Sequence, residues 1–192
     1  QGEEYTLGDT GGQSKPADVG KFADLFIAAD GTEYIAYYDD AWSRLLLAVG
    51  GAEGFTQHVV DESADVGQWP SLRVTDDGVV HIAYHDVENQ DLKYATGTPG
   101  SFVITTVDSG DYVGADTEIF MNGDLLSILY FDGQNNDMKL ATLAGGNWTT
   151  AVLAGDDGTG LGYHNEVIVS NGRYYAGCYD YTNRSIWLGA LQ

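Results

Sequence analysis

The sequence predicts an all-β fold made of four repeats of about 47 residues. The segments "YIAYYD", "HIAYHD", "SILYFD" and "AGCYD" resemble one another and end at aspartates spaced by 47, 46 and 48 residues, namely Asp39, Asp86, Asp132 and Asp180. Each segment follows an Asp-Gly or Asn-Gly dipeptide, which is the strongest short-range signal for a tight hairpin turn. The composition, with 13 Tyr and 26 Gly but 3 Pro, also favours strands joined by turns.

Each repeat contains places for four short strands. Upstream of each aspartate segment lie "KFADLFIAA", "QWPSLRVT", "ADTEIFM" and "YHNEVIVS", and downstream lie "RLLLAVG", "DLKYATG", "DMKLATL" and "RSIWLGA". A fourth strand begins near an aromatic residue at Phe55, Phe102 and Trp148. Four-stranded repeats of this length are typical of β-propeller blades.

The last repeat lacks a fourth strand at its own end, and "EEYTLGD", with Tyr5 in the aromatic position, resembles the missing piece. We therefore expect one domain over residues 1–192 with blades at about 17–63, 64–110, 111–156 and 157–192 plus 1–12. The N-terminal strand would then complete the last blade. A four-bladed monomeric ring and half of an eight-bladed homodimeric ring both remain open.

The stretch "PSLRVTDDGVVHIAYHD…DLKYAT" resembles bacterial propeller repeats of the sialidase-like (Asp-box or BNR-like) superfamily. Residues 74–81, "VTDDGVVH", keep the D-x-G of the Asp-box and lack its Ser and Trp. A sialidase also needs an arginine cluster, whereas this chain offers few arginines: Arg44, Arg73, Arg173 and Arg184. The resemblance implies the fold and a secreted protein, without the sialidase catalytic set.

Charge excludes several classes of partner. Eight basic and 29 acidic residues give a net charge of −21, which argues against binding nucleic acid or inserting into an anionic membrane. Cys178 is the single cysteine, so no internal disulfide is possible, and no apolar run has the length of a membrane span. Few lysines and the start "QGEEY" favour a secreted, periplasmic or cell-surface bacterial protein.

His81 and His85 are four residues apart, as in helical zinc motifs. In a strand this spacing separates them by roughly 13 Å, too far for one metal ion. The other repeats place Tyr38, Phe131 and Tyr179 where His85 stands. We expect His85 to fill a packing position, with a ligand contact as the alternative.

Long polar loops are expected to gather on one face of the propeller, where function concentrates on a rigid scaffold. Aromatic residues in or beside these loops suit stacking on a sugar or a protein hot spot. The candidate ligand-binding residues are Trp42, Trp69, His85, Tyr163, His164 and Glu166.

One position recurs at the start of the innermost strand, and it is occupied by Asp24, Ser71, Glu118 and Glu166. In a ring these side chains would converge on the central channel. They suit a Ca²⁺ ion, which prefers oxygen ligands, or acid–base chemistry, or hydrogen bonds to their own loops. By contrast, we expect the ring of aspartates that recurs in every repeat, Asp39, Asp86, Asp132 and Asp180, to cap turns.

These observations favour a secreted, non-enzymatic binding module with an acidic, loop-rich face that takes a glycan or protein ligand, with Ca²⁺ as a candidate cofactor and no catalytic residues. The alternative is a glycan-active hydrolase or lyase that uses Glu118, Glu166 and His164 at the channel mouth. A purely structural segment of a larger surface protein is the third possibility.

Overall fold

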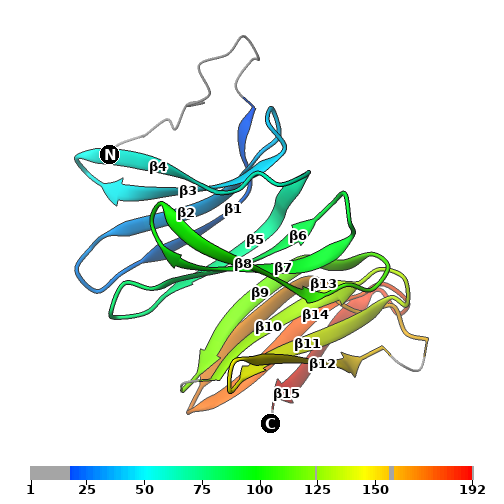
Figure 1. The fold of residues 1–192 in the computed structure, drawn as a ribbon. Helices are drawn as coiled ribbons and strands as arrows, with labels where there is room; N and C mark the ends of the chain where they lie inside the picture. Colours follow the sequence, from blue (N-terminus) through cyan, green and yellow to red (C-terminus); the bar gives the residue numbers. More distant parts are fainter. Residues whose placement is uncertain (1–17, 124, 156–157, 192) are drawn as a thin grey trace.

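The computed structural model describes residues 18–191 except 124 and 156–157, and these residues form strands and no helix (Figure 1). The first two sheets use β1 (Val19–Ile27), β2 (Glu33–Asp39), β3 (Arg44–Gly51), β4 (Gly54–Asp61), β5 (Val66–Val74), β6 (Val80–Asp86), β7 (Asp91–Thr98) and β8 (Ser101–Asp108). The other two use β9 (Val113–Asn122), β10 (Leu125–Asp132), β11 (Asp137–Ala144), β12 (Asn147–Ala154), β13 (Tyr163–Ser170), β14 (Arg173–Asp180) and β15 (Ser185–Leu191).

Every sheet is an antiparallel meander in which strands adjacent in sequence pair with one another. We call the sheets blade 1 (β1–β4), blade 2 (β5–β8), blade 3 (β9–β12) and blade 4 (β13–β15). The innermost strands β1, β5, β9 and β13 follow one another in space, so successive blades pack face to face. This arrangement confirms the predicted all-β repeat and is consistent with a propeller.

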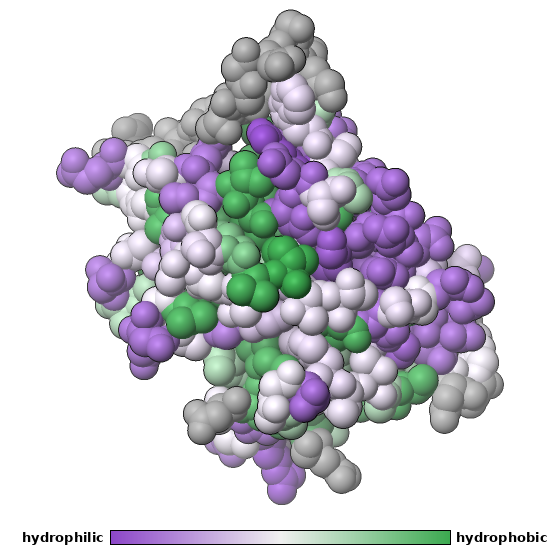
Figure 2. All heavy atoms as spheres, viewed as in Figure 1, coloured by the Kyte–Doolittle hydropathy of each residue, from purple (hydrophilic) through white to green (hydrophobic). Residues whose placement is uncertain are grey.

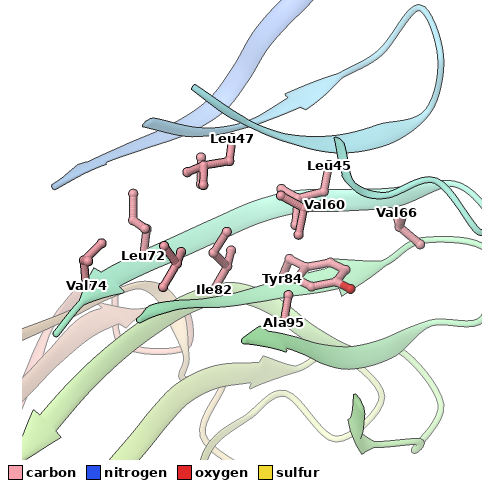
Figure 3. Packing of buried hydrophobic residues seen from close by; sticks show 11 residues of the cluster. Leu45, Leu47, Val60, Val66, Leu72, Val74, Ile82, Tyr84 and Ala95 are labelled. Carbon is pink, nitrogen blue, oxygen red and sulfur yellow. The ribbon is translucent and has the colours of Figure 1, made fainter. Parts of the chain in front are cut away.

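Apolar side chains from facing blades form the core. Between blades 1 and 2, Leu45 and Leu47 pack against Leu72, Ile82 and Tyr84, and all five are fully buried (Figure 3). Equivalent clusters join blade 2 to blade 3 and blade 3 to blade 4. Burying each of these side chains contributes about 1.5–3 kcal/mol, so the junctions between blades hold the inner strands in place.

The predicted tight turn needs positive φ at both central residues, and the hairpin turns meet this requirement in one blade and depart from it in another. Asn171 and Gly172 meet this requirement, with φ of 51° and 72°. At the first hairpin the positive φ falls on Gly31 alone, which donates its N–H to the carbonyl of Ala28. This geometry matches a longer loop built on a type I turn, so at the first hairpin the predicted position was right and the turn type was wrong.

Blade 4 has three described strands. The segment predicted to supply its fourth strand, residues 1–12, lies outside the described residues. Blades 1 and 4 stand at opposite ends of the row of blades in Figure 1. Ring closure and the number of blades in a complete ring therefore stay predictions. None of the described residues forms a helix long and apolar enough to cross a membrane.

Candidate functional site

Each innermost strand contains the same irregularity, a shift in register with its neighbour. At this shift a non-glycine residue adopts a left-handed backbone with φ between 47° and 55°, and the four residues are Phe22, Trp69, Asp116 and His164. Such a conformation costs an L-residue roughly 1–2 kcal/mol. The four strained residues lie at equivalent positions, so the repeat brings the different side chains Phe22, Trp69, Asp116 and His164 to the same level of the inner strands.

A shallow pocket of about 200 Å³ opens among these residues and receives side chains from all four innermost strands. Its lining is Phe22, Ala23, Trp69, Pro70, Asp116, Thr117, His164 and Asn165. The rings of Phe22 and Trp69 lie 4.9 Å apart on one side. On the other side, exposed His164 places Nδ1 3.9 Å from Oδ1 of Asp116. The pocket therefore has an aromatic half and a charged half.

Two residues further along each strand lies the predicted central set, and the structure brings several of its members together. The hydroxyl of Ser71 lies 3.3 Å from Oε2 of Glu118 and 3.5 Å from Oδ2 of Asp24. The same hydroxyl accepts the backbone N–H of Ile119 at 3.0 Å, and Asp24 accepts the N–H of Leu72 at 2.7 Å. Ser71 thus links the carboxylates of blades 1 and 3.

Arg73 completes this cluster, and sequence reasoning did not select it. Its guanidinium lies 2.7 Å from Oε1 of Glu118 and 3.8 Å from Oδ2 of Asp24. The equivalent positions in the other blades are apolar, namely Phe26, Phe120 and Ile168. A single arginine at an otherwise apolar repeat position was the signal that could have identified it.

Glu118 is the member of the cluster whose pKa departs most from its ordinary value. Its side chain is 14% exposed. Burial raises its pKa to about 7, Arg73 opposes this shift, and the carboxylates of Glu166 and Asp24 add to it. A carboxyl that retains a proton near neutral pH is suited to act as a general acid.

The arrangement gives the expected Ca²⁺ site no support. Within the described ranges, no group of three or more His, Cys, Asp or Glu residues is placed to hold a metal ion. Arg73 supplies positive charge beside Glu118 and Asp24 instead. Calcium binding by Asp24, Ser71, Glu118 and Glu166 stays a prediction.

The structure separates the predicted ligand-binding residues into two groups. Trp69 and His164 line the pocket, and Glu166 lies two residues beyond His164 on β13. Tyr163, the first residue of β13, packs against Phe131 with tilted rings whose centroids lie 4.2 Å apart.

The other two predicted residues lie elsewhere. His85 is 1% exposed, and its Nδ1 forms a 2.8 Å hydrogen bond with the carbonyl of Val113. Burial lowers the pKa of His85, which supports its packing role and leaves no surface for a ligand. Trp42 belongs to the β2–β3 turn, where the guanidinium of Arg44 lies over its ring.

Comparisons with known proteins reveal similarity of fold. No family model and no curated sequence matches the chain. An exo-β-1,3-galactanase from Phanerochaete chrysosporium, solved with β-1,3-galactotriose, matches with a TM-score of 0.57 and 14% identity over 83% of this chain and 43% of its own.

Two further structures match at similar levels. A GH43 β-1,3-galactosidase with galactodeoxynojirimycin has a TM-score of 0.60 and 13% identity over 88% of this chain and 71% of its own. The Aleuria aurantia lectin with α-methyl-L-fucoside has a TM-score of 0.53 and 12% identity over 92% and 61%. These likenesses support a β-propeller and do not single out the sialidase-like superfamily.

The comparisons contradict the leading prediction of a non-enzymatic binding module. The similar structures include several GH43 glycosidases and a polysaccharide lyase, which are enzymes that act on glycans, although at 11–15% identity they share only the fold with this chain. The chain spans 43% and 42% of the lengths of the first two of them.

Proposed function

We propose that this chain is the catalytic part of a glycoside hydrolase, with its reaction centred on Glu118. One observation carries the proposal: a largely buried carboxyl whose pKa is about 7 sits at the centre of the inner strands, next to other carboxylates and an arginine. The fold it shares with glycan-active enzymes supports the same conclusion.

Glycoside hydrolysis needs one protonated and one ionised carboxyl on either side of the scissile bond. Glu118 holds a proton near neutral pH and would transfer it to the leaving oxygen as the glycosidic C–O bond breaks. Glu166, whose charge already acts on Glu118, would accept a proton from the water that attacks the anomeric carbon. The products are the leaving alcohol and a hemiacetal, and the two carboxyls have exchanged protonation states.

The remaining residues of the cluster have positioning roles in this scheme. Ser71 and Arg73 each hold one oxygen of Glu118, which fixes the direction of its acidic proton. Arg73 also limits how far the pKa of Glu118 rises, because a nearby cation favours the carboxylate. Asp24 supplies a negative charge that acts in the opposite direction.

The pocket suggests an uncharged sugar as the substrate. The paired rings of Phe22 and Trp69 offer a face on which a pyranose can stack, while Asp116 and His164 can hydrogen-bond to its hydroxyls. The net charge of −21 disfavours anionic polysaccharides. Neutral galactose-containing glycans are the first substrates to test, and extracellular action fits a polymer substrate.

The test is a hydrolysis assay on neutral oligosaccharides and polysaccharides, with the chain and two variants. We expect turnover by the native chain and a loss of about 10²–10⁴-fold in Glu118→Gln. The control is Glu88→Gln, an exposed acid in the β6–β7 turn, which should retain full activity. Sugar binding without turnover, or undiminished activity in Glu118→Gln, would refute the proposal.

A further inference from the structure

One backbone hydrogen bond recurs in all four blades at the end where the long loops lie. The residue after each turn aspartate donates its N–H to the carbonyl of a residue in the loop that enters the same blade, at 2.8 or 2.9 Å. The pairs are Asp40 to Asp18, Val87 to Asp65, Gly133 to Tyr112 and Tyr181 to Gly160. The bond therefore places two equivalent residues of each blade side by side.

Blades 3 and 4 carry a tyrosine and a glycine at these paired positions, in opposite order. In blade 3 the entering loop supplies Tyr112 and the turn supplies Gly133, whereas in blade 4 the loop supplies Gly160 and the turn supplies Tyr181. A Cβ on Gly133 would overlap the ring of Tyr112. The missing side chain at Gly133 therefore lets this ring lie against the turn. Blades 1 and 2 have no aromatic residue at either position.

The two turn tyrosines are exposed and lie near Tyr163. Tyr112 is 42% exposed and Tyr181 is 67% exposed. The ring centroid of Tyr163 lies 6.1 Å from that of Tyr181. Burial raises the pKa of the Tyr163 hydroxyl, and the nearby hydroxyls of Tyr112 and Tyr181 add to this shift. We call Tyr112, Tyr163 and Tyr181 the tyrosine platform.

The tyrosine platform adjoins the pocket described above. The ring of buried His85 lies 5.6 Å from that of Trp69 in the pocket and 5.8 Å from that of Tyr112, so one packed side chain supports both. Asp116 lines the pocket and is close enough to Tyr163 for its charge to add to the effect of burial on that hydroxyl's pKa. A ligand that extends from the pocket on this side meets the platform next.

Blade 1 differs from blades 3 and 4 at the same level of the molecule. Its paired residues Asp18 and Asp40 are bridged by Lys21, whose Nζ lies 3.0 and 2.6 Å from their carboxylates. This part of the surface is charged and offers no ring on which a sugar could stack. The asymmetry gives an extended ligand one direction, from the pocket toward blades 3 and 4.

The tyrosine platform has the chemistry of a site for an uncharged, hydroxyl-rich ligand. No hydrogen bond joins any of its three hydroxyls to another residue within the described ranges. An exposed phenol offers an apolar ring face for stacking and a hydroxyl for hydrogen bonding. Figure 2 shows hydrophilic residues gathered on the right of the view, the side on which the β6–β7 turn lies in Figure 1. The net charge of −21 disfavours an anionic ligand.

We propose that the tyrosine platform binds further sugar units of a neutral oligosaccharide or polysaccharide whose reacting unit occupies the pocket. This inference rests on the proposed function and extends it, because it makes the substrate a chain of several units. Tyr112 stacks on the unit next to the pocket, and Tyr181 stacks on the unit after it. The galactanase of similar fold was solved with β-1,3-galactotriose, which makes this trisaccharide the probe.

The first test measures how tightly the Glu118→Gln chain binds galactose and β-1,3-galactotriose by titration calorimetry. Loss of the acid slows hydrolysis, so the trisaccharide stays intact during the titration. We expect the trisaccharide to bind about tenfold more tightly than galactose, because stacking on the added rings contributes to affinity. Tyr181→Ala in the same chain should weaken trisaccharide binding by about 3–10-fold and leave galactose binding within about twofold.

The matched control is Tyr175→Ala in the same chain. Tyr175 lies on β14 near the Asn171–Gly172 hairpin turn, at the opposite end of the strand from Tyr181. The control should bind both sugars as tightly as the Glu118→Gln chain does. Circular dichroism verifies that each variant folds.

A second variant displaces a platform ring without removing it. Gly133→Ala adds a methyl group where the ring of Tyr112 lies, and the backbone of Gly133 is outside the left-handed region, so alanine fits it. Binding of the trisaccharide should weaken by about 3–10-fold while galactose binding stays unchanged. The control is Gly51→Ala, where the added Cβ meets open space.

The outcomes separate this inference from the proposed reaction. Equal affinities for the two sugars, no measurable binding of the trisaccharide, or unchanged binding in either Tyr181→Ala or Gly133→Ala would overturn the platform. Hydrolysis of short galactosides by the native chain would then still stand. Conversely, tighter trisaccharide binding that depends on both variants, in a chain without turnover, would support the platform and refute the glycosidase reaction.

Discussion

Two sets of equivalent positions carry acidic residues, and they differ in how closely the repeats agree. The turn aspartates are identical in all blades, whereas the central positions hold an aspartate, a serine and two glutamates. In three blades the turn aspartate accepts a backbone N–H and a side-chain amide from one asparagine, as with Asp132 and Asn135 at 3.1 and 3.0 Å. In blade 1, Asp39 accepts from Trp42 and pairs with Arg44. The predicted turn-capping role is confirmed.

The central set departs from the repeat in both composition and environment. Arg73 stands on one inner strand at a position that is apolar in the other blades, and it pairs with Glu118 on the next. Glu118 is the member whose pKa rises to about 7. A structural hydrogen bond works equally well in every blade, whereas a reaction needs one acid and one base in different environments. Identity between blades therefore indicates structure, and the departure from it indicates chemistry.

The largest expected effect on stability concerns a turn aspartate. In Asp132→Ala, the two donors of Asn135 lose their acceptor and Lys139 loses a nearby carboxylate at 3.8 Å. Because Asp132 is 4% exposed, we expect the free energy of unfolding to fall by about 2–4 kcal/mol. Urea unfolding measures it, and catalysis by the folded variant should be unchanged.

The control for this substitution is Asp111→Ala, which removes an exposed carboxylate that accepts a 3.3 Å hydrogen bond from Gln134. It should change the free energy of unfolding by less than about 0.5 kcal/mol. Equal losses in the two variants would mean that the turn aspartates do not have the structural role assigned to them.

The repeats predicted the fold well because the same pattern of turns and strands recurs in the sequence of each blade. They also predicted that Asp24, Ser71, Glu118 and Glu166 occupy equivalent positions. The burial of the Glu118 carboxyl could not be predicted from these positions, because it depends on side chains that three different blades contribute. The leading function, which the comparisons contradict, was favoured because the repeats agree so closely, and that agreement drew attention away from Arg73 and the surroundings of Glu118.

Individual aromatic residues were harder to place. Trp69 lines the pocket together with Phe22 and His164, which occupy the equivalent positions of their own blades. Trp42 was selected from its loop position alone, yet its ring lies beneath Arg44. Both tryptophans were selected because they lie in or beside the long loops, and their repeat position is what distinguishes the pocket residue Trp69 from Trp42.

The second prediction concerns the dependence of stability on pH. Burial and neighbouring carboxylates raise the pKa of Glu118 from 4.5 to about 7, so the folded state favours its protonated form. Above about pH 4.5 the unfolded chain loses this proton first, and the folded state becomes progressively less stable until about pH 7. The free energy of unfolding of Glu118→Gln minus that of the native chain should rise over this interval, by up to roughly 3 kcal/mol. A difference that does not vary with pH would contradict the assigned burial.

The third prediction concerns the dependence of activity on pH. If protonated Glu118 is the acid, activity should fall on the alkaline side as this group ionises. Arg73 lowers the pKa of Glu118, so Arg73→Gln should move the alkaline limb to higher pH. Arg73→Lys keeps the charge and should restore most of the native profile. The exposed Arg173→Gln on blade 4 serves as the control and should leave the limb in place.

The smallest expected effect tests the identity of the blades directly. Replacing Asn89, Asn135 or Asn183 by Ala removes one side-chain hydrogen bond of 2.8–3.0 Å to the turn aspartate and leaves the backbone bond in place. Each substitution should cost about 0.5–1.5 kcal/mol in the free energy of unfolding. Because the three contacts are equivalent, the three losses should agree within about 0.5 kcal/mol. Widely different losses would show that the blades differ energetically even where their sequences agree, and identity between repeats would then no longer distinguish structural residues from catalytic ones.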